Sequence, residues 1–222
     1  MRATSRMSNI LGVRNLPQPA AQVALTASAA GTAASELPAE PVVSERVGRL
    51  GRLLAIDERL LVAAARFQRP WRTRLARTLT RVGDASSWTL MVLAFLAARG
   101  PLHSLGARMG AATLLATGLS QLLKRGLNRP RPTRAIEGFE ALADNPDAFS
   151  FPSGHTAAAF AVAVALAGAP FGLGPATIAL AVGIGASRVY LGAHYPLDVA
   201  AGAALGTVAG ALARVLVAAL GC

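Results

Sequence analysis

Residues 156–186, TAAAFAVAVALAGAPFGLGPATIALAVGIGA, decide the fold because no charged side chain interrupts them. The run exceeds the roughly 20 apolar residues that cross a bilayer as one helix. The segment PFGLGP at 170–175 divides the run with prolines and glycines, which break helices. The sequence therefore predicts two antiparallel membrane helices joined by this turn.

The composition of the whole chain agrees with a membrane protein. Of its 222 residues, 53% are hydrophobic and 15% are charged, whereas about 25% of an ordinary soluble domain is charged. The net charge is +11, yet the cations are not interleaved with aromatic residues and accompany no nucleic-acid-binding motif. We therefore expect no nucleic-acid partner, and we interpret the basic residues as contacts for anionic lipid head groups of the bilayer.

Three further apolar runs predict additional membrane helices. Residues 86–98 and 109–123 are each shorter than a full span, so each must include flanking residues. Residues 197–220 form the last run, and their many alanines and glycines allow close helix contact. The sequence therefore predicts an all-α integral membrane bundle of about five transmembrane helices, with six as the alternative, and no sheet.

The N-terminal part of the chain differs from the bundle in composition. Residues 1–45 are rich in Ala, Ser and Pro without sustained periodicity, which is typical of a disordered tail. Residues 46–82 are basic, and their apolar positions across 47–67 repeat with the period of an amphipathic helix. Because many charges accompany these positions, we expect an interfacial N-terminal helix rather than a span. The membrane domain then covers residues 83–222.

Three polar segments interrupt the apolar runs, at residues 124–132, 151–155 and 187–198. If successive helices alternate in direction, all three segments lie at one face of the membrane and share a pocket. Such a pocket holds several cations, two histidines and one carboxylate, but no set of carboxylates that would bind a divalent metal. This charge pattern fits a phosphate group, and we expect neither a metal nor another cofactor.

Phosphate chemistry suggests roles for the cations and for one helix start. Arginine grips two phosphate oxygens at once and lysine adds a point charge, so we assign a phosphate clamp to Lys124, Arg131 and Arg188. Ser153 and Gly154 stand where the next helix begins, and unpaired backbone amides at a helix N-terminus attract anions. These five residues are the predicted phosphate-binding set.

The histidines and the carboxylate fit a nucleophilic mechanism. A neutral imidazole can attack phosphorus when its other nitrogen has an acidic partner, and His194 and Asp198 supply that pair. The leaving alkoxide needs a proton, and we assign this role of proton donor to His155. The catalytic residues are therefore predicted to be His194, His155 and Asp198.

The three segments resemble the signature motifs of the phosphatidic acid phosphatase type 2 family, in its membrane-bound branch, over residues 83–210. The resemblance implies that residues 83–222 form a lipid phosphatase that works without a metal and through a phosphohistidine. It gives the phosphate-binding roles to the five residues named above, the acid role to His155, the nucleophile to His194 and the orienting role to Asp198. The matching motifs are Lys124-x6-Arg131-Pro132, Pro152-Ser153-Gly154-His155 and Ser187-Arg188-x5-His194-x3-Asp198.

The resemblance does not identify one substrate. It implies hydrolysis of a terminal phosphate from a membrane lipid phosphate or diphosphate, of the phospholipid or the polyprenyl type, such as undecaprenyl diphosphate. The alternatives are a catalytically silent lipid-binding or scaffold protein of the same fold and a vanadate-dependent haloperoxidase, which shares the motifs. We expect selectivity among lipids to come from residues 133–149 and from the lipid-facing walls of the spans.

The number of spans determines on which face of the membrane the site lies. Five spans would place the site on the side of the Arg-rich flank, so the positive-inside rule predicts the cytoplasmic face of a bacterial inner membrane. A sixth span would move the site to the other face. We expect Asp84 to cap the first span, Trp88 to lie in the interfacial aromatic belt, and Arg129 to be a lipid-facing anchor rather than a head-group ligand.

Overall fold

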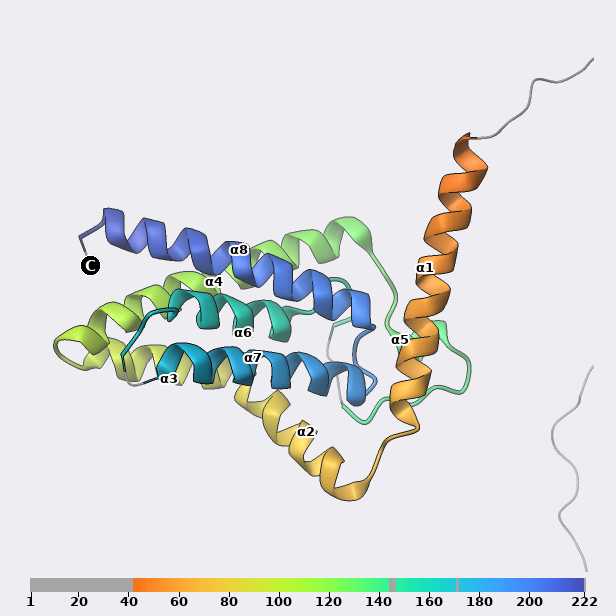
Figure 1. The fold of residues 1–222 in the computed structure, drawn as a ribbon, viewed down its shortest axis with the longest axis horizontal. Coiled ribbons are helices and arrows are strands. Elements are labelled where there is room, and N and C mark those ends of the chain that lie inside the picture. The colour runs from red at the N-terminus through yellow and green to blue at the C-terminus, as the bar shows by residue number, and fades with distance from the viewer. Residues whose placement is uncertain (1–41, 144–146, 171, 222) are drawn as a thin grey trace, which may run out of the picture. The chain divides into compact units, whose positions relative to one another are not determined.

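The fold is helical throughout the residues that the computed structural model describes, which are 42–143, 147–170 and 172–221 (Figure 1). In these residues the only strand-like pairing is one antiparallel bridge between Pro130 and Phe149. The all-α prediction is therefore confirmed. The helices are α1 (Val42–Ala65), α2 (Pro70–Val82), α3 (Ala85–Ala97), α4 (Pro101–Leu127), α5 (Pro132–Ala135), α6 (Gly154–Ala165), α7 (Leu173–Tyr190) and α8 (Pro196–Ala219).

Proline and glycine set the helix boundaries. Proline stands in the first turn of α2, α4, α5 and α8, where its missing N–H costs no hydrogen bond. Gly168 and Gly172 have φ angles of 84° and 70° between α6 and α7, a conformation that suits glycine. Helix α7 begins at Leu173, inside the predicted break at 170–175, because a helix tolerates Pro175 in its first turn.

Helices α3, α4, α6, α7 and α8 correspond to the five predicted spans. Helices α7 and α8 are long and apolar enough to cross a membrane, whereas α3 and α6 are apolar but shorter. Helix α4 has 27 residues, and Arg108, Lys124 and Arg125 reduce its apolar character. The number of membrane crossings therefore stays a prediction.

Helix α8 packs against α6 through three glycines spaced one turn apart. A Cβ atom at Gly202, Gly206 or Gly210 would come within 2.6, 2.2 or 2.4 Å of a backbone oxygen at the start of α6 or along it. Only glycine permits this approach, so the close helix contact predicted from the small residues is observed. The contact fixes the start of α6, which carries His155, beside the start of α8, which carries Asp198.

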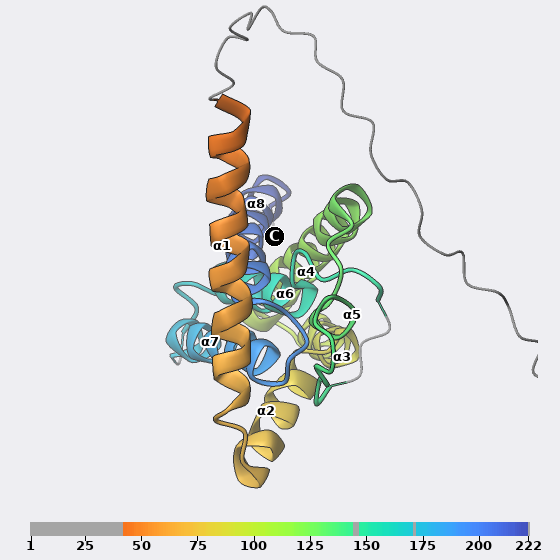
Figure 2. The ribbon, with the colours of Figure 1, turned by 90° about the vertical axis from the view of Figure 1, so that its right-hand side faces the viewer.

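The polar ends of the bundle helices meet at one end of the bundle. Helices α4 and α7 end there, and α6 and α8 begin there, so the chain direction alternates as expected (Figure 1). Figure 2 looks toward this end, with α1 passing in front of the bundle. The three polar segments of the sequence therefore converge.

Helix α1 corresponds to the helix predicted over 47–67. One of its sides is buried and the other is exposed. Asp57 and Leu61 are buried at 2% and 0% exposure, whereas Leu50 and Leu53 are 58% and 54% exposed. Exposed leucines on a basic helix fit an interfacial position, which stays a prediction. The predicted tail, 1–45, lies almost wholly outside the described residues.

Candidate active site

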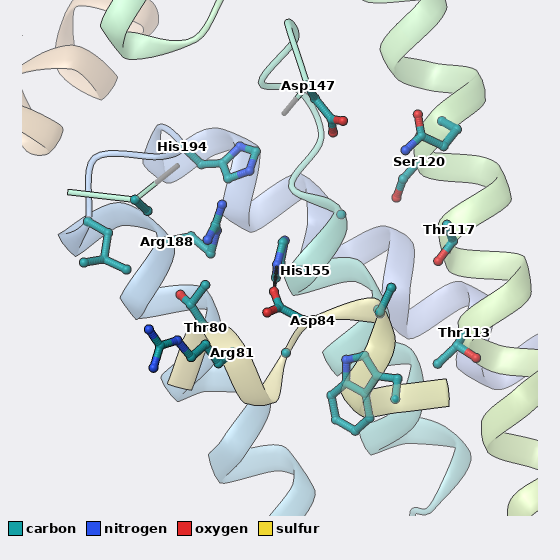
Figure 3. Close-up of a pocket in the computed structure, with 18 of the residues that line it drawn as sticks. Thr80, Arg81, Asp84, Thr113, Thr117, Ser120, Asp147, His155, Arg188 and His194 are labelled. Carbon is teal, nitrogen blue, oxygen red and sulfur yellow. Dashed lines mark hydrogen bonds and ion pairs between the residues drawn. The ribbon is translucent and has the colours of Figure 1, made fainter. Parts of the chain in front are cut away.

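A cavity of about 770 Å³ lies where the polar segments meet (Figure 3). Within the described part of the chain, no group of three or more His, Cys, Asp and Glu side chains could hold a metal ion. Of the eight predicted site residues, Ser153 and Asp198 are fully buried and do not line the cavity. The other six line it: Lys124, Arg131, Gly154, His155, Arg188 and His194.

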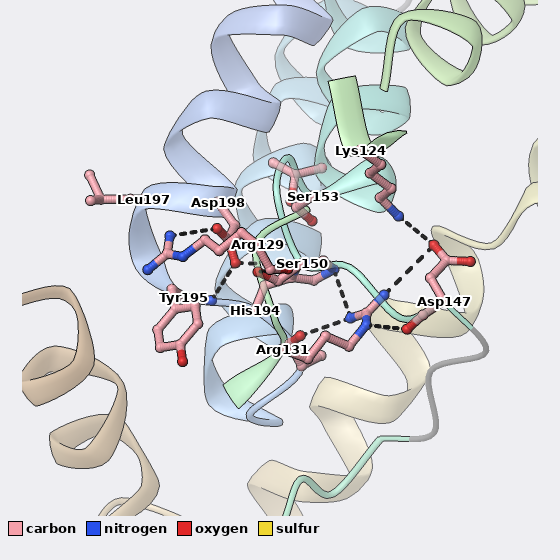
Figure 4. Close-up of polar contacts among 12 residues, drawn as sticks. Lys124, Arg129, Arg131, Asp147, Ser150, Ser153, His194, Tyr195, Leu197 and Asp198 are labelled. Carbon is pink, nitrogen blue, oxygen red and sulfur yellow. Dashed lines mark hydrogen bonds and ion pairs between the residues drawn. The ribbon is translucent and has the colours of Figure 1, made fainter. Parts of the chain in front are cut away.

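His194 is buried in the loop between α7 and α8, with 1% exposure. Its Nδ1 lies 3.6 Å from Asp198 Oδ2, slightly beyond hydrogen-bond range, and its Nε2 lies 3.4 Å from Arg131 Nη1 (Figure 4). Burial lowers the pKa of His194 to about 4, so the imidazole is neutral at pH 7. With its proton on Nδ1, beside the carboxylate, the lone pair of Nε2 is directed at the guanidinium.

Asp198 is fixed by the first turn of α8 and by the start of α6. Its Oδ2 accepts a hydrogen bond from the Tyr195 N–H at 2.9 Å, which closes the N-terminus of α8. Its backbone carbonyl accepts the N–H of Ser153 at 3.0 Å. The Ser153 hydroxyl lies 2.9 Å from the Thr156 hydroxyl. Ser153 therefore ties α6 to α8, and its hydroxyl is engaged within the protein.

Lys124 and Arg131 both meet the side chain of Asp147. Arg131 donates from Nε to the Asp147 carbonyl at 2.7 Å and from Nη1 to the Ala193 carbonyl at 2.9 Å, which fixes the guanidinium. Lys124 Nζ pairs with the Asp147 carboxylate, which also lies 3.7 Å from Arg131 Nη2. The hydrogen bond from Lys124 lowers the pKa of Asp147. A carboxylate therefore lies against two of the three cations of the predicted phosphate clamp.

His155, at the start of α6, has an acidic partner that the sequence did not reveal. Its Nε2 lies 2.8 Å from Oδ1 of Asp84, the residue before α3. The Asp84 side chain makes no capping hydrogen bond to α3, so the expectation that it caps this helix is wrong. The two side chains are 30% and 43% exposed, and both line the cavity. The site therefore contains a second histidine–aspartate pair.

Arg129 is also placed differently from the expectation. Its Nη1 lies 2.7 Å from Asp198 Oδ1, and its Nη2 lies 2.7 Å from Asp57 Oδ2. The guanidinium stacks over the Tyr195 ring, 4.0 Å from its centroid, and Asp57 Oδ1 accepts the N–H of Leu197 at 2.8 Å. Arg129 is thus a link from α1 to the carboxylate behind His194, and the lipid-facing assignment is wrong.

Trp88 of α3 likewise departs from its predicted interfacial position. Its side chain is 3% exposed and lines the cavity. Its burial inside the bundle excludes a place in an aromatic belt facing lipid head groups. That expectation is wrong.

A family model described as the PAP2 superfamily matches residues 105–221, which contain all three motifs. The chain belongs to the PAP2 superfamily. Its match covers more than half of the chain and all eight predicted site residues, whereas Asp57, Asp84 and Trp88 lie before it. The family model therefore carries no information about these three.

Several relatives of this PAP2 protein are named as phosphatases. It is 34% identical over 152 residues to decaprenylphosphoryl-5-phosphoribose phosphatase of Mycobacterium tuberculosis, covering 68% of this chain and 84% of the relative. It is 38% identical over 108 residues to lipid A 1-phosphatase of Rhizobium etli, covering 46% of each chain. The crystal structure of a transmembrane PAP2-type phosphatidylglycerolphosphate phosphatase of Bacillus subtilis matches with a TM-score of 0.62 at 27% identity, over 74% of this chain and 86% of that one. The protein is thus a membrane phosphatase.

Proposed function

We propose that this PAP2 phosphatase removes the terminal phosphate of a membrane lipid phosphate or diphosphate through a phosphohistidine on His194, without a metal. The placement of His194 carries the proposal, because a neutral imidazole has the Asp198 carboxylate on one side and the Arg131 guanidinium on the other. The relatives named for decaprenylphosphoryl-5-phosphoribose and for lipid A support a lipid substrate of the polyprenyl or phospholipid type.

The first half-reaction forms the phosphohistidine. Nε2 of His194 attacks phosphorus, the bond between phosphorus and the leaving oxygen breaks, and His155 gives its proton to that oxygen. Asp198 stabilises the imidazolium that forms, and Asp84 holds the proton donor. Phosphate displaces Asp147 and is bound by Lys124, Arg131, Arg188 and the start of α6 at Gly154, which Ser153 holds in place through its bond to Asp198.

The second half-reaction returns the enzyme to its starting state. A water molecule attacks phosphorus while the now neutral His155 takes one of its protons, and the bond between phosphorus and Nε2 breaks. His194 leaves the reaction neutral, and inorganic phosphate departs. The exposed side of the His155–Asp84 pair, at 30% and 43% exposure, gives this water access.

We also propose a membrane topology for the chain. Residues 83–222 form the membrane phosphatase domain, residues 46–82 lie at the interface, and five crossings place the site on the cytoplasmic face of a bacterial inner membrane. With five crossings the two termini lie on opposite faces. Alkaline phosphatase fused after the C-terminus should then be active, because it folds only outside the cytoplasm, whereas an inactive fusion of a functional enzyme would contradict five crossings.

Phosphate release by the detergent-purified protein, with EDTA present, tests the reaction. The panel contains phosphatidic acid, phosphatidylglycerol phosphate, undecaprenyl diphosphate and a polyprenyl-phosphate sugar phosphate. We expect the wild type and Arg214→Ala, a change at an exposed position of α8, to release phosphate from at least one lipid and His194→Ala to release none. Activity that EDTA removes and a divalent ion restores would contradict the metal-free mechanism.

A further inference from the structure

The cavity continues beyond the cations along a polar face of α4. Thr113, Thr117, Ser120 and Gln121 line it, and their spacing of about one helical turn puts them on one face. Figure 3 shows Ser120, Thr117 and Thr113 in a row along α4, on the wall across from His155 and Asp84. Thr117 and Gln121 are exposed and Thr113 is half-buried, whereas Ser120 is buried, so the row runs from the surface of the bundle into the cavity.

Two polar atoms in this part of the cavity wall are buried without a hydrogen-bond partner among the described residues. They are Ser120 Oγ and Trp88 Nε1, and the two residues are only 1% and 3% exposed. A hydroxyl in a helix commonly donates to its own backbone, as Thr113 does to the Met109 carbonyl at 2.9 Å. Ser120 makes no such bond, and an unsatisfied buried donor costs about 1–3 kcal/mol. Both residues line the cavity, so a group bound there can supply the missing partner.

The row lies where the group attached to the leaving oxygen has to sit. In an in-line displacement the leaving oxygen is opposite the nucleophile, so it points away from His194 and toward the proton donor His155. Beyond His155 the cavity is lined by Asp84 and by the α4 row. Leu114, also on its lining, is 76% exposed, which leaves a lipid chain a way out toward the bilayer.

We propose that the α4 row and Trp88 form a subsite for the hydroxyl groups of a polyhydroxylated head group, such as a sugar or glycerol, that carries the phosphate. This inference rests on the proposed function and names its substrate class. The donors and acceptors of the subsite are neutral, and residues 109–123 contain no cation. The further cations of the cavity lining, Arg77 and Arg81, stand on α2. A second phosphate beside the α4 row would therefore lack a counter-charge on that helix and would face the carboxylate of Asp84. The enzyme therefore prefers a phosphate monoester on a hydroxylated head group over a lipid diphosphate and over phosphatidic acid.

Substrate selectivity of two variants tests the subsite. Ser120→Ala removes the unpartnered hydroxyl, and Thr117→Val changes an exposed position of the row that folding tolerates. Each should lower kcat/KM about tenfold, the effect of one lost hydrogen bond, for phosphatidylglycerol phosphate and for the sugar phosphate. Values for phosphatidic acid and undecaprenyl diphosphate should change less than about twofold. The matched control is Thr207→Val on α8, where an exposed threonine donates to its own helix.

Lipid binding to an inactive variant tests the subsite independently of the proposed mechanism. In a His194→Ala, Trp71→Phe background the remaining tryptophan is Trp88, and its fluorescence should change when a lipid with a hydroxylated head group binds. Adding Ser120→Ala should weaken this binding about tenfold and leave phosphatidic acid binding unchanged. Equal losses for all four lipids, or a wild type that prefers phosphatidic acid or the diphosphate, would overturn the subsite, whether or not His194 is the nucleophile.

Discussion

The two histidine–aspartate pairs of the site are built differently. His194 and Asp198 are 1% and 0% exposed, lie four residues apart in the chain and are braced by Arg129 and Tyr195. His155 stands at the start of α6 and Asp84 just before α3, and their side chains are 30% and 43% exposed. A nucleophile benefits from a dry, fixed environment, whereas a group that exchanges protons with a leaving oxygen and with water needs access to both. The difference in burial thus matches the difference in proposed roles.

Removing the carboxylate of the buried pair should have the largest effect among the aspartate changes. Asp198→Asn leaves the imidazolium of the attack step without its counter-charge and permits the wrong tautomer, so kcat should fall about 10³-fold or more. Steady-state phosphate release from micelles measures this. A loss no greater than that of Asp84→Asn would remove the distinction between the two pairs.

The brace behind the buried pair should contribute mainly to stability. Arg129→Met leaves Asp57 and Asp198 buried without their shared cation, which should cost about 3 kcal/mol or more. The midpoint of thermal unfolding in detergent should fall clearly, and activity should fall with it. Arg125→Met, at an exposed position of the same segment, is the matched control. An unchanged midpoint for Arg129→Met would show that the network does not stabilise the fold.

The exposed pair should show a smaller loss that depends on the leaving group. Asp84→Asn keeps the shape but weakens the stabilisation of protonated His155, so kcat/KM, which reports formation of the phosphohistidine, should fall about tenfold for a lipid alkoxide. The loss should nearly vanish with p-nitrophenyl phosphate, whose leaving group needs little protonation, and Asp84→Glu should restore part of the lipid activity. An equal loss for both substrates would indicate a structural role only.

Acid should destabilise the protein through the buried pair. Burial holds the pKa of His194 at about 4 in the folded protein, whereas an unfolded histidine has a pKa of about 6.5. Between these values the unfolded chain binds more protons, so stability rises with pH across this window and levels off above it. The unfolding midpoint should therefore fall from pH 7 to pH 5, and the fall should be smaller in His194→Gln. Equal pH dependence in both proteins would argue against a buried neutral His194.

Sequence reasoning found the buried pair because its members share one motif and one spacing. It also predicted the helices, because charge-free runs and proline or glycine breaks are local signals. It missed Asp84 and Asp57 because their partners lie 71 and 72 residues away, and nothing in the spacing connects them. An aspartate before an apolar run resembles a cap, and a charged residue in an amphipathic helix resembles a solvated one. Only tertiary packing separates these cases.

The central claim, a phosphohistidine on His194, can be tested by trapping it. In His155→Ala, p-nitrophenyl phosphate should still phosphorylate the enzyme, because its leaving group needs no proton, while hydrolysis of the intermediate slows for want of a base. The enzyme is quenched in alkali, which preserves phosphohistidine, and its peptides are analysed by mass spectrometry. We expect a phosphoryl group on His194 and none in His155→Ala, His194→Ala. Phosphate on another residue, or none while p-nitrophenol is still released, would contradict the mechanism.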